Sequence, residues 1–151
     1  MYIISACLTG ENVKYNGGNN YCLEVVDFLK GRNYVLVCPE VLGGLSIPRD
    51  PCERTGDRVM DRGGKDVTEA FYEGARRCLE EVLEKVPPED IEGAILRKAS
   101  PSCGSGLIYD GTFSGTKIPG DGVFTALLKE HGIRVFTEDE ITEIDDKGDK
   151  Q

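Results

Sequence analysis

Short apolar runs alternate with longer amphipathic stretches along this chain, and this alternation restricts its fold more than any other feature. Apolar runs at residues 2–6, 34–37, 94–96 and 133–136 have the length and composition of buried strands. Helical spacing of apolar residues covers 21–30, 67–86 and 122–131, and a short helix is expected over 138–144. The alternation predicts an α/β fold: a Rossmann-like, open and mainly parallel sheet flanked by helices.

The chain has the size of one domain, and we assign residues 1–144 to it. The acidic residues 145–151 are expected to form a disordered tail. The long helix starts with Asp66-Val67-Thr68-Glu69, which has the form of a capping box, and ends at a pair of prolines. Residues 56–65 are compatible with a small hairpin, and the turn formers between 109 and 115 with another.

Charge and composition exclude several classes of protein. The chain has 18 Lys and Arg against 27 Asp and Glu, a net charge of −9, which disfavours a nucleic-acid partner. The four basic residues Lys14, Arg49, Arg54 and Lys98 are still compatible with a local basic patch. No segment has the form of a signal peptide or the ~18 apolar residues of a membrane span, which predicts a cytoplasmic protein without membrane contact. A single histidine, His131, excludes a multi-histidine metal site, and its place at a helix end favours a stabilising role.

Six cysteines are the unusual feature of the composition, and no two form a C-x-x-C pair. In a reducing cytoplasm they are expected to be free, catalytic or metal-bound. Cys22 and Cys78 lie on the apolar stripes of two expected helices and are interpreted as core residues. Cys52 lies in a proline-rich loop and is not assigned.

The remaining three cysteines, Cys7, Cys38 and Cys103, each follow an expected strand. Loops at the carboxyl ends of parallel strands share one edge of the sheet, so these cysteines are expected to meet there. Either they form a metal or catalytic site, or they are small buried residues near turns. As a site, three thiolates without imidazole would suit zinc or an iron–sulfur cluster, with one metal position open to a substrate sulfur.

Several ordered motifs extend this pattern over nearly the whole chain. They are SACLTG at 5–10, VKYNGG at 13–18, CPEVLGGL at 38–45, PR at 48–49, SPSCG at 100–104, IYDGTFSG at 108–115 and GDGV at 120–123. Together they resemble a family of small bacterial and archaeal proteins whose characterised type is thiouracil desulfidase. The resemblance covers roughly residues 3–140.

The resemblance implies a 4Fe–4S cluster held by Cys7, Cys38 and Cys103, with the fourth iron free to take sulfur from a small thiolated substrate. It implies an iron–sulfur-dependent desulfidase that acts on a small thiolated compound such as a thiopyrimidine and releases hydrosulfide by non-redox hydrolysis. Aerobic handling would oxidise the cysteines and remove the cluster.

The resemblance also assigns residues around the cluster. Glu40 is the expected proton shuttle, paired with Ser100 as the second catalytic residue. Arg49, Ser102 and Asp110 are expected to bind substrate, although a structural ion pair is an alternative for Arg49.

Two positions depart from the family pattern. Asn16 stands where relatives often carry Asp, and Gly43-Gly44 stands where some relatives carry an additional cysteine. If that cysteine is their second ligand, Cys52 would replace Cys38 in this role.

Two other functions are compatible with the same residues. The first is a non-catalytic accessory protein that binds an iron–sulfur cluster or zinc. The second is a metal-free enzyme that uses Cys103 as its nucleophile.

Overall fold

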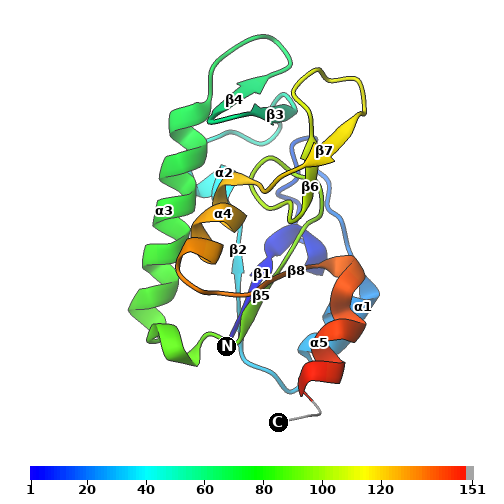
Figure 1. Cartoon of the computed structure of the whole chain (residues 1–151), viewed down its shortest axis with the longest axis vertical. Coiled ribbons are helices and arrows are strands. Elements are labelled where there is room, and N and C mark those ends of the chain that lie inside the picture. Colours follow the sequence, from blue (N-terminus) through cyan, green and yellow to red (C-terminus); the bar gives the residue numbers. More distant parts are fainter. Residues whose placement is uncertain (149–151) are drawn as a thin grey trace.

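A four-stranded parallel sheet forms the centre of the computed structural model, which describes residues 1–148 and the side chains of residues 1–144 (Figure 1). Its strands lie in the order β2-β1-β5-β8, and all neighbouring pairs are parallel. The strands are β1 (Tyr2–Ser5), β2 (Tyr34–Val37), β5 (Gly93–Leu96) and β8 (Val135–Thr137). The predicted α/β class and parallel sheet are therefore confirmed.

Helices cover both faces of this sheet. The helices are α1 (Leu23–Leu29), α3 (Thr68–Lys85), α4 (Val123–Glu130) and α5 (Ile141–Gly148). Ile3 faces α3 and α4, where it joins Phe71 and Phe124 in one buried cluster. The next residue, Ile4, faces α1 and α5 and joins Val25 in a second cluster. Successive strand residues point to opposite faces, so one apolar run supplies both cores.

Two antiparallel hairpins lie beyond the carboxyl ends of the strands (Figure 1). They are β3 (Cys52–Thr55) with β4 (Arg58–Asp61), and β6 (Leu107–Tyr109) with β7 (Lys117–Pro119). Short helical segments connect the elements: η1 (Ala6–Thr9), α2 (Pro39–Leu42) and η3 (Glu138–Glu140) each follow a strand, and η2 (Pro88–Asp90) follows α3. The hairpins therefore enclose the edge of the sheet at which the three strand-end cysteines were expected.

Two glycines let α2 lie directly on α3. A Cβ at Gly43 would come within 2.1 Å of the Ala70 carbonyl oxygen, and one at Gly74 within 1.9 Å of the Pro39 carbonyl oxygen. Both contacts are with backbone atoms, which cannot rotate away. The absence of these two side chains therefore sets the position of α2 and of Cys38, which immediately precedes it.

Some expected boundaries differ in the structure. Residue 66 does not cap α3 as a capping box would: Asp66 Oδ1 accepts a hydrogen bond from Thr68 N at 2.9 Å, and Val67 is the N-cap. The first hairpin begins at Cys52, four residues before the segment that the sequence suggested. Helix α5 includes residues 145–148, which were expected in the tail, and residues 149–151 of that tail lie outside the described residues.

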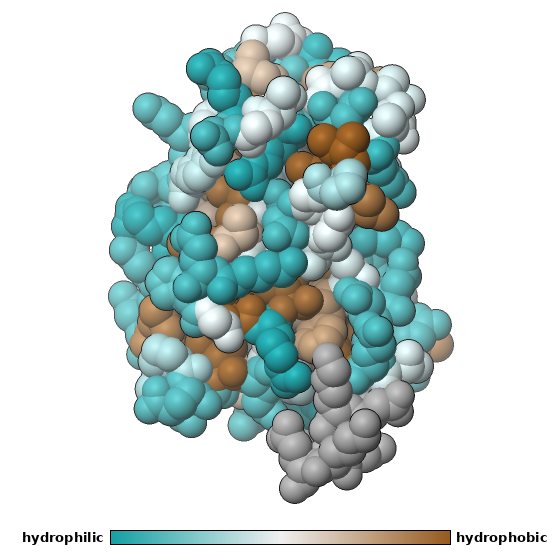
Figure 2. Space-filling view, viewed as in Figure 1, coloured by the Kyte–Doolittle hydropathy of each residue, from teal (hydrophilic) through white to brown (hydrophobic). Residues whose placement is uncertain are grey.

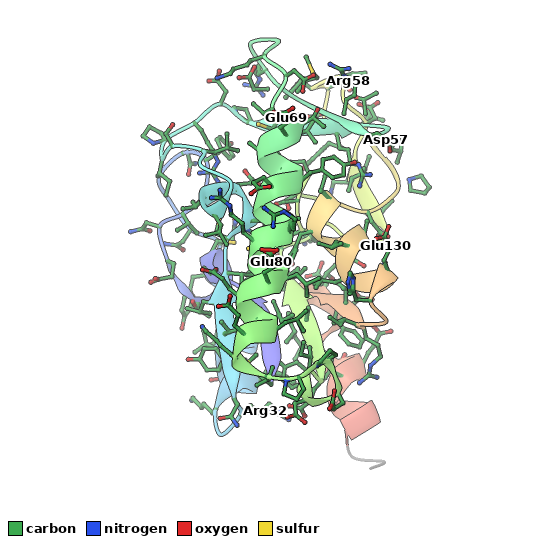
Figure 3. The ribbon with its side chains drawn as sticks, turned by 90° about the vertical axis from the view of Figure 1, so that its left-hand side faces the viewer. Arg32, Asp57, Arg58, Glu69, Glu80 and Glu130 are labelled. Carbon is green, nitrogen blue, oxygen red and sulfur yellow. The ribbon has the colours of Figure 1, made fainter. Side chains whose placement is uncertain are left out.

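The outer side of α3 is charged. Figure 3, which looks onto this helix, shows Glu69 and Glu80 along it, and Arg76 donates to Glu80 within one turn. Much of the face in Figure 2 is likewise hydrophilic, with apolar residues gathered in patches between the elements. Within residues 1–148, no helix combines the length and apolar character needed to cross a membrane.

Candidate active site

Cys7, Cys38 and Cys103 line one cavity of about 460 Å³ at the carboxyl edge of the sheet. Cys7 lies in η1 directly after β1, and Cys38 is the N-cap of α2 directly after β2. Cys103 lies in the loop that follows β5. The structure thus brings the three strand-end cysteines together, as the parallel topology predicted.

The environment of these thiols keeps them protonated when nothing is bound. Burial raises the pKa of Cys7 and of Cys38, and it raises the pKa of Cys103 to about 12. Hydrogen bonds oppose this shift: Asn20 Nδ2 lies 3.4 Å from Cys7 Sγ, and Ser102 Oγ lies 3.6 Å from Cys103 Sγ. Because thiolates are the metal-binding form, loading a metal here must release protons.

The donor set suits an iron–sulfur cluster. In the part of the chain that the structure describes, no three His, Cys, Asp or Glu side chains are arranged to hold a metal ion. The three thiols instead border an opening, and a cluster of several irons takes its ligands around its outside. Soft thiolates are the protein ligands that such clusters use. The three cysteines, without imidazole beside them, therefore fit the ligand chemistry of an iron–sulfur cluster.

Glu40 lies beside the thiols and is held through both carboxylate oxygens. Its Oε1 accepts a hydrogen bond from Arg49 Nε at 3.1 Å, and its Oε2 accepts one from Ser102 Oγ at 2.9 Å. The Glu40 and Arg49 side chains are 15% and 8% exposed, so the ion pair is mostly shielded from water. Glu40 is thus fixed in direct contact with the loop that carries Cys103.

The two serines of the SPSCG motif have different partners. Ser102 contacts Glu40 directly, whereas the Ser100 hydroxyl accepts a hydrogen bond from Cys103 N at 2.7 Å. The two hydroxyl oxygens lie 3.4 Å apart. Ser100, which the sequence paired with Glu40, therefore reaches the carboxylate through Ser102.

Arg49 and Asp110 are both engaged within the protein. Besides Glu40, Arg49 donates to the carbonyl oxygens of Ser46 and Val13, at 3.2 and 2.9 Å. This arrangement favours the structural ion pair for Arg49 over a substrate clamp. Asp110 does not line the cavity. Its Oδ1 accepts from Thr112 N and Oγ1, at 2.9 and 2.6 Å, and these bonds lower the pKa of Asp110.

The other cysteines occupy different environments. Cys52 also lines the cavity, and burial together with nearby Glu40 raises its pKa to about 12. Cys78 is fully buried in the cluster under α3, as predicted for a core residue. Cys22 is half-buried against the cluster under α1. His131 Nδ1 lies 3.0 Å from Leu127 O, at the end of α4 and outside the cavity.

A basic rim surrounds the cavity even though the chain is acidic. Three of the four residues considered for a local basic patch, Lys14, Arg49 and Lys98, line the cavity. The fourth, Arg54, does not line it and donates to the Asp121 carbonyl oxygen at 2.6 Å. Sequence reasoning missed three further cations of the rim: Arg62, Arg97 and Lys117.

Aromatic rings accompany the cations at this rim. Three cation–ring pairs line the cavity, with 5.5–5.7 Å from the cation to the ring centroid: Lys14 with Tyr15, Arg62 with Phe113, and Lys117 with Tyr109. Sequence reasoning also missed Phe113 and Glu53 as residues of the cavity. The DGTF motif beside Tyr109, which contains Phe113, was the signal that could have indicated it.

The chain is similar to known proteins over nearly its whole length. A family model described as 2-thiouracil desulfurase matches residues 2–140. The uncharacterized protein YbbK of Bacillus subtilis (strain 168) is 40% identical over 154 residues, which cover 95% of this chain and 99% of that protein. The solved structure of a 4Fe–4S-dependent thiouracil desulfidase, TudS, is 42% identical, with a TM-score of 0.88 over 99% of this chain and 98% of that one.

Proposed function

The chain belongs to the 2-thiouracil desulfurase family, and from this we propose that it is a 4Fe–4S-dependent desulfidase that removes sulfur from a thiolated pyrimidine such as thiouracil. The likeness to TudS extends over the whole chain and supports this proposal. The observation that carries it is the convergence of three thiols with the Glu40–Ser102 pair on one cavity.

The proposed reaction is a hydrolysis without net oxidation or reduction. The thiocarbonyl carbon loses its bond to sulfur and gains one to the oxygen of water, so that the products are a carbonyl compound and hydrogen sulfide. Water supplies both protons of the hydrogen sulfide, and no external electron donor is required.

Cys7, Cys38 and Cys103 would hold the cluster, and Cys52 lies at the same cavity without a place in the strand-end pattern. Held by three protein ligands, such a cluster would supply an open iron position for the sulfur of the substrate. Since the thiols are neutral when free, these side chains must lose their protons as the cluster enters.

Glu40 and Ser102 are the residues positioned to move protons. The Ser102 hydroxyl donates to Glu40 Oε2, so Ser102 would pass its own proton to the carboxylate while its oxygen takes one from water. Arg49 holds the other oxygen, Oε1, which keeps the carboxylate turned toward Ser102. Ser100, 3.4 Å from Ser102 and bound to Cys103 N, orients the serine loop.

Anaerobic reconstitution with iron and sulfide tests the cluster. We expect Cys7→Ala, Cys38→Ala and Cys103→Ala each to lose most iron and labile sulfide per chain, whereas the matched control Cys22→Ala retains them. Retention of the full cluster by all three variants would refute the ligand assignment. Cys52→Ala addresses the remaining alternative, because loss of iron in this variant and not in Cys38→Ala would make Cys52 the second ligand.

Hydrogen sulfide release from 2-thiouracil by the reconstituted protein tests the reaction. Glu40→Gln is expected to keep the cluster and lose about 10²–10⁴-fold in kcat, the usual contribution of a general acid–base group. Ser102→Ala should lose more activity than Ser100→Ala, because Ser102 contacts the carboxylate directly.

The same measurements distinguish the other two functions. An accessory protein would hold the cluster and release no sulfide from the wild type. A metal-free enzyme would stay active with iron near zero, but the burial that raises the pKa of Cys103 to about 12 opposes its use as a nucleophile.

A further inference from the structure

Glu53 ties the loop of the second hairpin to the first hairpin. Its carboxylate, on β3, is 9% exposed and accepts hydrogen bonds from Gly111 N at 2.9 Å and Phe113 N at 3.1 Å. Hydrogen bonds to a charged acceptor are about twice as strong as neutral ones. A buried carboxylate thus fixes two backbone amides of the loop between β6 and β7.

The loop packs closely on β3 at the same place. A Cβ at Gly111, where φ is 96°, would come within 1.9 Å of Thr55 Oγ1. The loop therefore approaches β3 more closely than any residue with a side chain would permit, and its distance from the cavity is set by this contact and by Glu53.

Phe113 has a backbone conformation that needs such support. Its φ of 57° lies in the left-handed region, which is uncommon for a residue with a bulky side chain. Residues of this kind persist where their surroundings hold them, and they cluster at sites that clamp ligands. Here Glu53 holds the Phe113 amide, so the carboxylate acts through the backbone on the direction of the ring.

Phe113 belongs to the lining of the cavity of the three cysteines. Phe113 is half-buried and lines this cavity, and the Arg62 guanidinium lies 5.7 Å from its ring centroid. Thiouracil is a flat heteroaromatic ring, and such rings stack on aromatic side chains with about 1–3 kcal/mol per base.

From these contacts we infer that Phe113 is a specificity-determining residue that stacks on the ring of the thiolated substrate, and that Glu53 is its positioning residue. The inference rests on the proposed function and names the surface of the site that recognises the ring. Phe113 contacts the ring rather than the reacting carbon, so its loss should raise KM more than it lowers kcat.

The experiment measures KM and kcat for 2-thiouracil, and the Kd of uracil, with cluster-loaded protein. Phe113→Ala is expected to raise KM and Kd by about 5- to 150-fold, the equivalent of 1–3 kcal/mol of stacking. Phe113→Tyr should restore affinity, and Phe113→Leu, which is apolar but has no ring, should restore little. The control Tyr72→Ala removes an exposed aromatic ring on α3 and should leave both constants unchanged.

Glu53 is tested in the same assay. Glu53→Ala should weaken uracil binding while iron per chain is retained. Both amides donate to the same oxygen, Oε1, so Glu53→Gln keeps an acceptor for them but not the charge and should recover part of the affinity. If Glu53 acts through Phe113, the double variant binds uracil no more weakly than Phe113→Ala alone. A purely structural role would make the two effects independent and additive.

The outcomes separate this inference from the proposed function. An active wild type whose KM and uracil Kd do not change in Phe113→Ala, with the cluster retained, overturns the stacking role and leaves the desulfidase proposal intact. Equal affinities for Phe113→Leu and wild type overturn it as well. A loaded wild type that neither releases sulfide from 2-thiouracil nor binds uracil overturns both.

Discussion

Replacing Gly74 by alanine is expected to separate α2 from α3. The new Cβ would lie 1.9 Å from the Pro39 carbonyl oxygen, whereas ordinary contacts begin at 3.4 Å, so α2 must move by 3.4 − 1.9 = 1.5 Å. Overpacking costs about 1–3 kcal/mol, and a contact with backbone atoms belongs at the upper end of this range. Alanine is about 1 kcal/mol better than glycine inside a helix, which leaves a net loss of about 2 kcal/mol.

Denaturant unfolding of the metal-free protein measures the loss of free energy, and thermal unfolding measures the change in Tm. For a domain of this size, 2 kcal/mol corresponds to a decrease of about 4–8 °C in Tm. Because α2 directly follows Cys38, iron retention after reconstitution should fall as well. Glu81→Ala, at an exposed position of the same helix, is the matched control and should change Tm little. A Gly74→Ala protein as stable as the wild type would refute the argument, because it would show that α2 is free to shift.

Three further perturbations test other parts of the structure. Thr125→Val removes the buried hydroxyl that donates to the Cys103 carbonyl oxygen at 2.7 Å, and should lower the free energy of unfolding by about 1–2 kcal/mol in denaturant titration. Glu138→Gln removes the charge that pairs with Arg97 at 2.5 Å; since the Arg97 side chain is 35% exposed, a loss of about 1–2 kcal/mol is expected, decreasing at high salt. Burial raises the pKa of Cys78 above the value of 9.0 of a free thiol, so the unfolded chain loses this proton first as pH rises. Stability of the metal-free protein should therefore fall above about pH 9, and less steeply in Cys78→Ala.

Most of the fold could be predicted from local patterns. The run at 34–37 predicted β2 over the residues that the structure shows, and the spacing of Phe71, Ala75 and Cys78 predicted the buried side of α3. These signals are local, because a strand or helix must repeat its apolar residues at its own period to cover a core. The first residue of a helix was harder to predict where a side chain can accept a hydrogen bond from more than one nearby amide. Asp66, at the start of α3, is such a case and accepts from Thr68 N.

The part of the candidate site that depends on strand topology could be predicted from the sequence. Parallel strands place their carboxyl ends at one edge, so the positions of Cys7, Cys38 and Cys103 after three strands were enough to expect their convergence. Two of the additional cations of the rim, Arg62 and Lys117, could not be found in this way. Arg62 directly follows β4 and Lys117 lies in β7, and the orientation of these hairpins over the edge depends on packing between distant segments.

The sequence by itself therefore determined the sheet, its helices and the edge where the thiols meet, because hydrophobic periodicity and strand order suffice for these. Only the tertiary structure decided which serine meets Glu40 and which residue holds Phe113. Ser102 lies 62 residues from Glu40, and Glu53 lies 60 residues from Phe113. Hydrogen bonds over such separations depend on the path of irregular loops, and no periodic pattern in the sequence records that path.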